Sequence, residues 1–195
     1  MGERRLLIAS GNPGKLHEYR ELLAGTGLEL AGWETGAAED RDSYAANATL
    51  KAEAACAASG LPALGDDSGL EVVALDGFPG LHSARLGAAQ DEREQLLFAR
   101  LKGIPRPWKA RFVCALALAF PGQRARVFMG LREGEVVEPR KGGTGFGYDP
   151  VFLVPEVGKT FAEMVPDEKH RWSHRGVAVR ALLKSGALAE ISGNR

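Results

Sequence analysis

Apolar runs and amphipathic stretches alternate along the first third of the chain. The run RLLIAS at 5–10 predicts a short strand. The segment 12–27 predicts a helix, because its leucines and Tyr19 recur at helical spacing and share one face. Asn12 is typical of an N-cap, and Gly25 is typical of the residue that ends a helix. The alternation indicates an α/β protein.

The next stretch continues the alternation and then interrupts it with two acidic residues. LELAGW at 28–33 predicts a second strand, and the alanine-rich segment 43–60 predicts a second helix. Residues 63–75 predict a strand, a turn and a further strand. Asp66 and Asp67 would lie at the turn, because DDSG is typical of turns.

The second half of the chain contains the clearest strand. In ARFVCALALAF at 110–120, large residues alternate with small ones, so one face of the strand is bulky and the other is nearly flat. The other expected elements are a helix at 91–103, strands at 124–131, 135–139 and 149–155 with a turn at Glu133–Gly134, and a last helix from Ser173 to about Lys184. Parallel-type elements early and a meander late predict a mixed sheet covered by helices.

Composition is that of an ordinary globular protein. Hydrophobic residues make up 45% of the 195 residues, and 25 basic residues balance 25 acidic ones. The zero net charge argues against nucleic acid as a partner, because nucleic-acid-binding proteins have a basic excess. The N-terminal apolar run is too short for a signal peptide, and no run reaches the length of a membrane span. We expect a cytoplasmic protein without a membrane partner, built as a single domain over 1–195, with Cys56 and Cys114 reduced and buried.

SGNPGK at 10–15 joins the first expected strand to the first expected helix. Its small residues let backbone N–H groups approach a phosphate, the helix N-terminus adds partial positive charge, and Lys15 adds a full one. The segment is not a Walker A loop, because the four-residue gap before Gly-Lys and the following Ser or Thr are missing. An ordinary capped strand–helix turn explains the same residues, so this segment alone does not decide between the two interpretations.

Asp66 and Asp67 stand between two apolar runs, where adjacent carboxylates repel each other. Carboxylates at a strand end are common ligands of Mg²⁺, which keeps several waters and also takes substrate phosphate oxygens. The acidic run AEDRD at 38–42 offers Glu39, Asp40 and Asp42 as further candidate ligands, and an exposed charged loop is the alternative interpretation of that run. The alternative interpretation is a turn with solvated aspartates.

Two later segments combine aromatic, basic and acidic residues. KGGTGFGYDP at 141–150 is a glycine-rich loop that places two aromatic side chains beside an acidic one, which suits stacking on a nucleobase. EKHRWSHRG at 168–176 has two histidines four apart, but an arginine occupies the place of the zincin glutamate, which argues against zinc. Its lysine, second histidine and second arginine suit hydrogen bonds to phosphate or purine oxygens. A plain glycine-rich connection and a solvated basic face are the alternatives.

Taken in order, five segments resemble one family: SGNPGK, GDDSGLEV, LDGFPGLHSAR, GTGFGYDPVF and SHRG. They are similar to the Ham1-type inosine/xanthosine triphosphate pyrophosphatases, over nearly the whole chain. The resemblance implies an α/β fold with an elongated mixed sheet flanked by helices and two lobes around a substrate groove. It also implies a Mg²⁺-dependent homodimer that cleaves the α–β bond of the purine nucleoside triphosphates dITP, ITP and XTP. The products would be the nucleoside monophosphate and pyrophosphate.

The resemblance also implies roles for single residues. Asp67 would be the proton acceptor and, with Glu39, a ligand of Mg²⁺, which would offset the repulsion between the paired aspartates. The sequence does not decide whether Asp67 takes the proton directly or only orients the water. The residues implied for the triphosphate are Ser10, Gly11, Asn12, Pro13, Gly14, Lys15, Lys51, Ser68 and Arg85. Those implied for the purine are Phe146, which would stack on the base, the neighbouring Gly147 and Tyr148, and Asp149, Lys169, His174 and Arg175, which would read its oxygenated edge.

Two other functions fit the same residues. A pyrophosphatase for ordinary or differently modified triphosphates needs the same phosphate chemistry, because base preference depends on a few side chains. A nucleotide-sensing module would bind a triphosphate without cleaving it. Release of pyrophosphate from a panel of triphosphates with Mg²⁺ separates the three functions.

Overall fold

The computed structural model describes residues 4–87 and 89–191. The strands among these residues form one seven-stranded sheet in the order β2-β1-β3-β4-β5-β6-β7. β1 (Arg5–Ala9) pairs in parallel with β2 (Glu29–Gly32) and β3 (Ala63–Val72), whereas β6 (Phe152–Val154) pairs antiparallel with β5 (Arg126–Val136) and β7 (Lys159–Thr160). The mixed α/β sheet expected from the sequence is therefore confirmed.

The chain folds as two compact units, each assembled from separate segments. Unit 1 consists of Met1–Asp67, Cys114–Gly130 and Gly176–Arg195, and unit 2 consists of Ser68–Val113 and Leu131–Arg175. The chain passes between the units within β3, within β4 (Trp108–Ala119), within β5 and within α5 (His174–Lys184). The two units agree with the two lobes that the resemblance implies, and the single domain over 1–195 stays a prediction.

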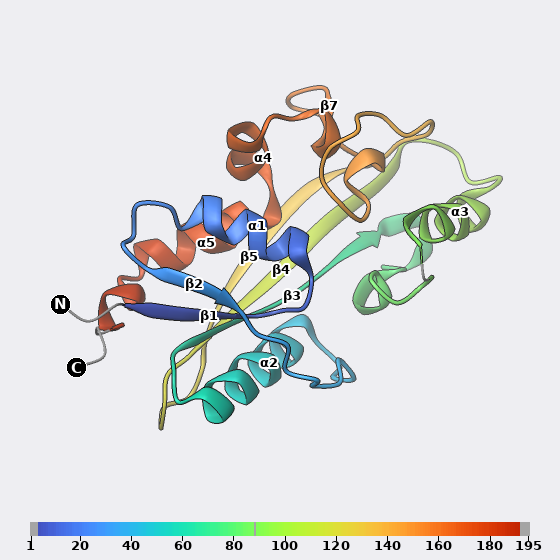
Figure 1. Ribbon diagram of the computed structural model, residues 1–195. Coiled ribbons are helices and arrows are strands. Elements are labelled where there is room, and N and C mark those ends of the chain that lie inside the picture. Colours follow the sequence, from blue (N-terminus) through green and yellow to red (C-terminus); the bar gives the residue numbers. More distant parts are fainter. Residues whose placement is uncertain (1–3, 88, 192–195) are drawn as a thin grey trace. The chain divides into compact units, whose positions relative to one another are not determined.

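In unit 1, two helices cover opposite faces of the parallel strands (Figure 1). α1 (Pro13–Leu22) lies on one face and α2 (Tyr44–Ser59) lies on the other. The bulky residues of β3 and β4 pack with α1 and with α5 (His174–Lys184) in one hydrophobic core. The flat face predicted for β4 is also buried within the chain, because Ala115 and Ala117 are 0% exposed.

Small residues bring α2 close to β3. A β-carbon on Gly65 of β3 would stand 2.1 Å from the carbonyl oxygen of Ala48 and 2.8 Å from the amide nitrogen of Ala52. The helix begins after Ser43, whose hydroxyl accepts a hydrogen bond from a first-turn amide, and it ends at Gly60 in the left-handed conformation. Alanine and glycine at the contact therefore hold the polar side chains of α2 directly over β3.

β3 differs from the expected strand, turn and strand. It runs without interruption from Ala63 to Val72, and Asp66 and Asp67 lie inside it. The prediction of a turn at DDSG is wrong, because it follows the local preference of aspartate and glycine for turns. In the folded chain, donors from α1 and α2 satisfy the two carboxylates, so the backbone can stay extended.

Unit 2 has its own core of aromatic and aliphatic side chains. Leu97 of α3 (Gln90–Leu101) and the phenylalanines of β4 and β6 belong to this core, and the rings of Phe112 and Phe152 meet edge to face at 4.7 Å. The expected turn at Glu133–Gly134 is wrong, because β5 continues to Val136. Gly134 serves close packing instead: a β-carbon there would stand 2.4 Å from the carbonyl oxygen of Leu153.

Three further elements were either shortened or not expected. The strand expected at 149–155 is a 3-10 turn (Asp149–Val151) followed by β6, and neither β7 nor α4 (Pro166–Trp172) is predicted by the sequence pattern. Short 3-10 turns also lie at Val73–Leu75, Gly80–His82, Phe161–Glu163 and Ala187–Glu190. Both cysteines are free and buried, as expected. No helix of the described residues has the length and apolarity to cross a membrane.

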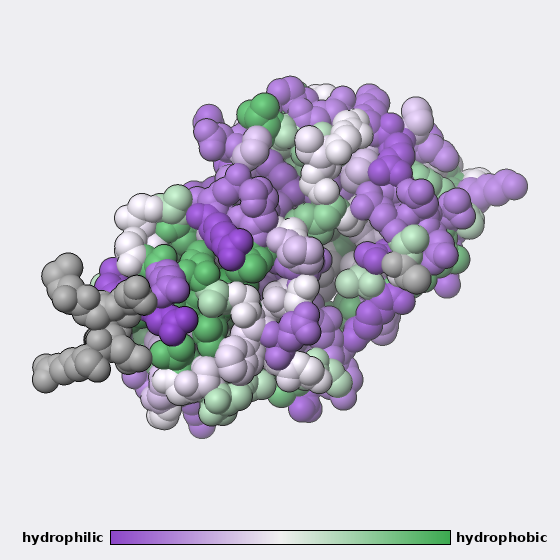
Figure 2. Space-filling model, in the orientation of Figure 1, coloured by the Kyte–Doolittle hydropathy of each residue, from purple (hydrophilic) through white to green (hydrophobic). Residues whose placement is uncertain are grey.

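Figure 2 shows hydrophobic side chains on the face that carries α1 and β2. A cavity of about 450 Å³ lies there, at the C-terminal end of α1. Its lining residues are Arg20, Leu23, Ala24, Gly25, Gly27, Leu28 and Leu30. Because the Ser10–Lys15 segment lies at the opposite end of α1, this cavity is separate from the predicted phosphate site.

Candidate active site

Two successive residues of β3 present carboxylates to two different helices. Side chains of neighbouring strand residues point to opposite faces of a sheet, so Asp66 faces α1 and Asp67 faces α2. Asp66 is 0% exposed and Asp67 is 5% exposed. A buried carboxylate is costly unless it is hydrogen-bonded or paired with a cation. Each helix supplies the donors for the carboxylate on its own side.

Asp66 is surrounded by donors. Lys15 donates from Nζ to Asp66 Oδ1 at 2.7 Å, and Tyr19 donates from its hydroxyl to Asp66 Oδ2 at 2.5 Å. The thiol sulfur of Cys114 lies 3.8 Å from the same Oδ2. The backbone carbonyl oxygen of Asp66 accepts from Lys15 Nζ at 3.3 Å and from Lys51 Nζ at 2.5 Å. Asp66 therefore holds the two lysines predicted to contact phosphates, one from each helix.

Asp67 is held from the α2 side. Asn47, which is fully buried, donates from Nδ2 to Asp67 Oδ2 at 2.9 Å. Burial raises the pKa of the Asp67 carboxyl, while the charge of Lys51 and the hydrogen bond from Asn47 lower that pKa in part. A carboxylate with a raised pKa is a stronger proton acceptor than a solvated aspartate. Catalysis by Asp67 stays a prediction, with which the raised pKa is consistent.

Glu39 lies on the loop before α2 and pairs with Lys51, the two charged atoms being 2.5 Å apart. The negative charge of Glu39 raises the pKa of Asp67 further, so the two carboxylates act on each other. Two neighbouring carboxylates are the protein share of a typical Mg²⁺ site, whose remaining ligands are waters and substrate phosphates. The donor set therefore fits Mg²⁺. Among the described residues, no three or more His, Cys, Asp or Glu side chains form a group that could hold a metal ion.

The Ser10–Lys15 segment forms a capped turn between β1 and α1. The side-chain oxygen of Asn12 accepts from the amides of Gly14 at 2.8 Å and Lys15 at 3.3 Å, and Pro13 occupies the first turn of the helix. The amide of Asn12 donates in turn to Ser10 Oγ at 3.2 Å. These contacts satisfy the capped-turn interpretation, and the positive charge offered to an anion comes from Lys15 and the helix N-terminus. Phosphate binding by Ser10, Gly11, Asn12, Pro13, Gly14 and Lys15 stays a prediction.

In unit 2, the structure brings most of the predicted base-reading residues together. Asp149 Oδ2 accepts from the amide of Phe146 and from Lys169 Nζ, both at 2.7 Å. The Lys169 ammonium lies 5.0 Å, and the Arg175 guanidinium 5.6 Å, from the centre of the Phe146 ring. Gly145 makes this arrangement possible, because a β-carbon there would stand 2.2 Å from Asp149 Oδ2.

The start of α5 contributes two of these residues. Arg175 is 2% exposed and donates from Nη2 to Ser68 Oγ at 3.2 Å. His174 is 4% exposed, and its ring stacks on Phe112 with centroids 4.5 Å apart and planes 8° apart. The stack fixes the plane of the imidazole, and the guanidinium is held beside the first unit 2 residue of β3.

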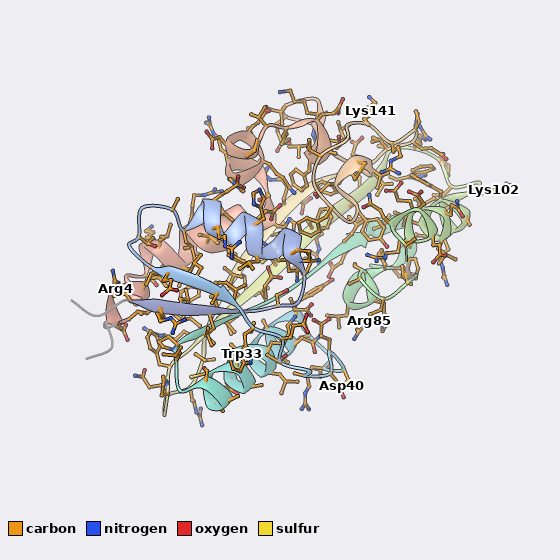
Figure 3. The ribbon with its side chains drawn as sticks, in the orientation of Figure 1. Arg4, Trp33, Asp40, Arg85, Lys102 and Lys141 are labelled. Carbon is orange, nitrogen blue, oxygen red and sulfur yellow. The ribbon has the colours of Figure 1, made fainter. Side chains whose placement is uncertain are left out.

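Three other predicted residues also belong to unit 2. Arg85 is exposed and donates to the carbonyl oxygen of Leu81 at 2.9 Å (Figure 3). Tyr148 is 3% exposed and belongs to the hydrophobic core, where burial raises its pKa to about 12. Gly147, between Phe146 and Tyr148, has a φ of 62°, which favours glycine. Substrate binding by these three residues stays a prediction.

Two residues of unit 1 that hold the paired aspartates in place were not predicted as functional from the sequence. Asn47 anchors Asp67, and Tyr19 anchors Asp66. The position of Asn47 within an alanine-rich helix is a usable signal, because asparagine is a poor helix former and needs a reason to be there. Tyr19 gave no such signal, since an aromatic residue on the apolar face of a helix is also ordinary core.

Comparison with known proteins assigns the family. The model of the Ham1 family matches residues 6–185. The chain belongs to the Ham1 family. This Ham1-family chain is 48% identical over 190 residues to a dITP/XTP pyrophosphatase from Thermus thermophilus, covering 93% of this chain and 91% of that protein. It is 44% identical over 196 residues to a dITP/XTP pyrophosphatase from Symbiobacterium thermophilum, covering 97% and 99%.

Solved structures agree with the Ham1 assignment. The Ham1 protein of Staphylococcus aureus has a TM-score of 0.81 and 33% identity, covering 95% of this chain and 99% of that one. A HAM1 protein from Coxiella burnetii has a TM-score of 0.83 and 34% identity, covering 94% and 98%. The resemblance based on the five segments is therefore confirmed, together with the α/β fold of a mixed sheet flanked by helices.

Proposed function

We propose that this Ham1-family chain hydrolyses non-canonical purine nucleoside triphosphates, namely dITP, ITP and XTP, to the nucleoside monophosphate and pyrophosphate. The observation that carries the proposal is its 48% identity, over nearly its full length, to a protein named dITP/XTP pyrophosphatase. Removal of such triphosphates would keep deaminated bases out of the nucleotide pool.

Unit 1 supplies the groups for phosphate chemistry. Hydrolysis needs a water oriented for in-line attack, and it needs positive charge to offset the triphosphate oxygens. Asp67, whose pKa is raised by burial, would orient the water and accept its proton. Lys15 and Lys51 would contact the phosphates, and Asn47 would keep the Asp67 carboxylate in place by its hydrogen bond.

We place Mg²⁺ at Asp67 and Glu39 as part of the same proposal. When bound, it would supply positive charge against the triphosphate and would offset the like charges of the two carboxylates. Lys51 neutralises Glu39 in this structure. When Mg²⁺ neutralises Glu39 instead, the Lys51 ammonium would be released toward a phosphate. Chelation of divalent cations should abolish turnover, and readdition of Mg²⁺ should restore it.

Unit 2 supplies the groups for the base. A purine stacked on Phe146 would displace the Lys169 ammonium and the Arg175 guanidinium from over that ring, and both cations would then be available to the edge of the base. These donors suit the 6-oxo group of hypoxanthine and xanthine, whereas adenine presents an amino donor there and would leave them unpaired. Leaving buried polar groups unpaired can reduce kcat/KM by about 10⁴ or more. ITP should therefore be strongly preferred to ATP.

One assay separates the candidate functions. The pure protein is incubated with Mg²⁺ and each of ITP, dITP, XTP, GTP and ATP, and pyrophosphate is measured. The proposal predicts rapid release from the first three. Equal release from ITP and ATP would favour a pyrophosphatase without this base selectivity, and no release despite binding would favour a nucleotide sensor.

A homodimer and a cytoplasmic location complete the proposal. Val127, Met129 and Leu131 alternate along β5 and are 40%, 50% and 41% exposed, so they present one apolar stripe that a second copy could cover. Two free buried thiols suit a reducing compartment. A monomeric mass by light scattering at micromolar concentration, or a dimer that survives Met129→Lys, would contradict the assignment of this stripe.

A further inference from the structure

Two side chains of α1 donate hydrogen bonds to one buried carboxylate. Lys15 and Tyr19 are four residues apart, so they lie on the same face of the helix. Lys15 donates to one oxygen of Asp66, and Tyr19 donates to the other. Tyr19 and Asp66 are both 0% exposed, and the Lys15 side chain is 13% exposed. The tyrosine ring also packs in the core of unit 1, so its hydroxyl is the part that needs a separate explanation.

We propose that Tyr19 is a positioning residue for Lys15. The Tyr19 hydroxyl fixes Asp66 Oδ2, and this leaves Asp66 Oδ1 to hold the Lys15 ammonium beside the Ser10–Lys15 segment. The inference rests on the proposed function, in which Lys15 contacts the triphosphate. Tyr19 would act through Asp66 and Lys15 without touching the substrate.

The geometry explains why the hydroxyl matters. An aspartate carboxylate rotates within a broad, roughly two-fold torsional well, so a single partner does not fix both of its oxygens. A hydroxyl donor to a carboxylate at 2.5 Å belongs to the short, charge-assisted class of hydrogen bonds and restricts that rotation. The Lys15 ammonium has three N–H donors, and two acceptors on Asp66, Oδ1 and the carbonyl oxygen, set its direction. The third N–H can then be offered to a phosphate oxygen.

The same contact joins the phosphate-binding segment to the strand that carries the proposed base. Lys15 lies in the first turn of α1, directly after the Asn12 cap. Fixing Lys15 to Asp66 therefore fixes the start of α1 to β3. Asp67 is the next residue of β3 and points to the opposite face. A loose Asp66 would let the polyphosphate groups shift relative to Asp67.

The test compares Tyr19→Phe with Tyr44→Phe in the full-length protein. Each change keeps an aromatic ring and removes one buried hydroxyl, but only that of Tyr19 lies on Asp66. Binding of inorganic tripolyphosphate with Mg²⁺ is measured by calorimetry, and KM and kcat are measured with ITP. For Tyr19→Phe we expect the tripolyphosphate Kd and the KM for ITP to rise together by about tenfold, with kcat within about threefold. Tyr44→Phe should leave both constants within about twofold.

A second set of variants tests whether the effect passes through the ion pair. In a Lys15→Met/Asp66→Asn background, both partners are neutral, and Tyr19→Phe should no longer change the tripolyphosphate Kd. A folded Tyr19→Phe protein with unchanged Kd and KM would overturn the inference, and so would an equal effect of Tyr19→Phe in both backgrounds. Absence of tripolyphosphate binding by the wild-type protein would also overturn it. A tripolyphosphate Kd that responds as expected in a protein that hydrolyses no triphosphate would contradict the proposed function alone.

Discussion

Neutralising the two adjacent aspartates of β3 should have opposite effects on stability. Asp67→Asn removes a charge whose burial raises the carboxyl pKa, so the folded state no longer bears the cost of holding that charge out of water. The asparagine keeps an oxygen that can accept from Asn47 Nδ2. Asp66→Asn instead leaves the Lys15 ammonium without its charged partner.

The expected change in the free energy of unfolding follows from the contacts that each substitution removes. Breaking a buried ion pair from one side costs about 3–5 kcal/mol. Lys15 is partly exposed and keeps the Asp66 carbonyl oxygen, so we expect Asp66→Asn to lower the free energy of unfolding by about 2–3 kcal/mol. In a chain of this size that lowers Tm by roughly 4–12 °C. Asp67→Asn should leave the free energy of unfolding unchanged or raised, and it should reduce kcat for ITP by about 10²–10⁴ if Asp67 is the base.

The pH dependence of the free energy of unfolding tests the direction of the Asp67→Asn effect. The unfolded chain ionises Asp67 near the ordinary value of 3.8, whereas the folded chain does so at a higher pKa. Wild-type stability therefore falls relative to Asp67→Asn as pH rises above 3.8, and the difference levels off above the folded-state pKa. Urea unfolding at several pH values, with steady-state kinetics at saturating Mg²⁺, measures both effects. Near-normal turnover by Asp67→Asn, or a stability loss equal to that of Asp66→Asn, would refute this account of β3.

Three further predictions test other parts of the structure. Gly65→Ala should lower the free energy of unfolding by about 1–3 kcal/mol in a denaturant titration, because its β-carbon would stand 2.1 Å from the Ala48 carbonyl oxygen, and a neutral result would mean that α2 packs less closely. Tyr148 should ionise near pH 12 in a spectroscopic titration from which the Tyr148→Phe signal is subtracted. The free energy of unfolding should fall by up to about 2–3 kcal/mol as pH rises from 10.0 to about 12, whereas ionisation near 10.0 would place Tyr148 outside the core. Phe146→Leu should raise the KM for ITP by about tenfold or more but leave the tripolyphosphate Kd unchanged, and an equal change in both would contradict a base-stacking role.

The elements were predictable where one local signal dominates. The N-cap at Asn12 with Pro13 located the start of α1, and Gly60 located the end of α2. The alternation of large and small residues in 110–120 located β4. In these segments the local preference and the final packing agree, which is the usual condition for a correct prediction.

The errors occurred where distant residues decide the local structure. DDSG favours a turn, but Lys15, Tyr19 and Asn47 reach the two aspartates from helices far away in the sequence. Gly134 favours a turn as well, but close contact with β6 requires a residue without a side chain there. Neither contact is visible in a single sequence without homologues.

The candidate site was predictable in composition but not in its connections. The resemblance implied roles for Asp67, Glu39 and the cationic residues, and the structure places several of them in two clusters, one in each unit. The buried anchors behind them, Asn47 and Tyr19, belong to no motif, and only the asparagine within an alanine-rich helix gives a local signal. Their roles follow from atoms that meet only in the folded chain.

Identification of the products tests the central claim most directly. The pure protein is incubated with ITP and Mg²⁺, and the phosphorus-containing products are followed by ³¹P nuclear magnetic resonance. The account predicts IMP and pyrophosphate in equal amounts, no IDP, and little or no reaction when ATP replaces ITP. Formation of IDP and inorganic phosphate, or binding of ITP without turnover, would contradict it.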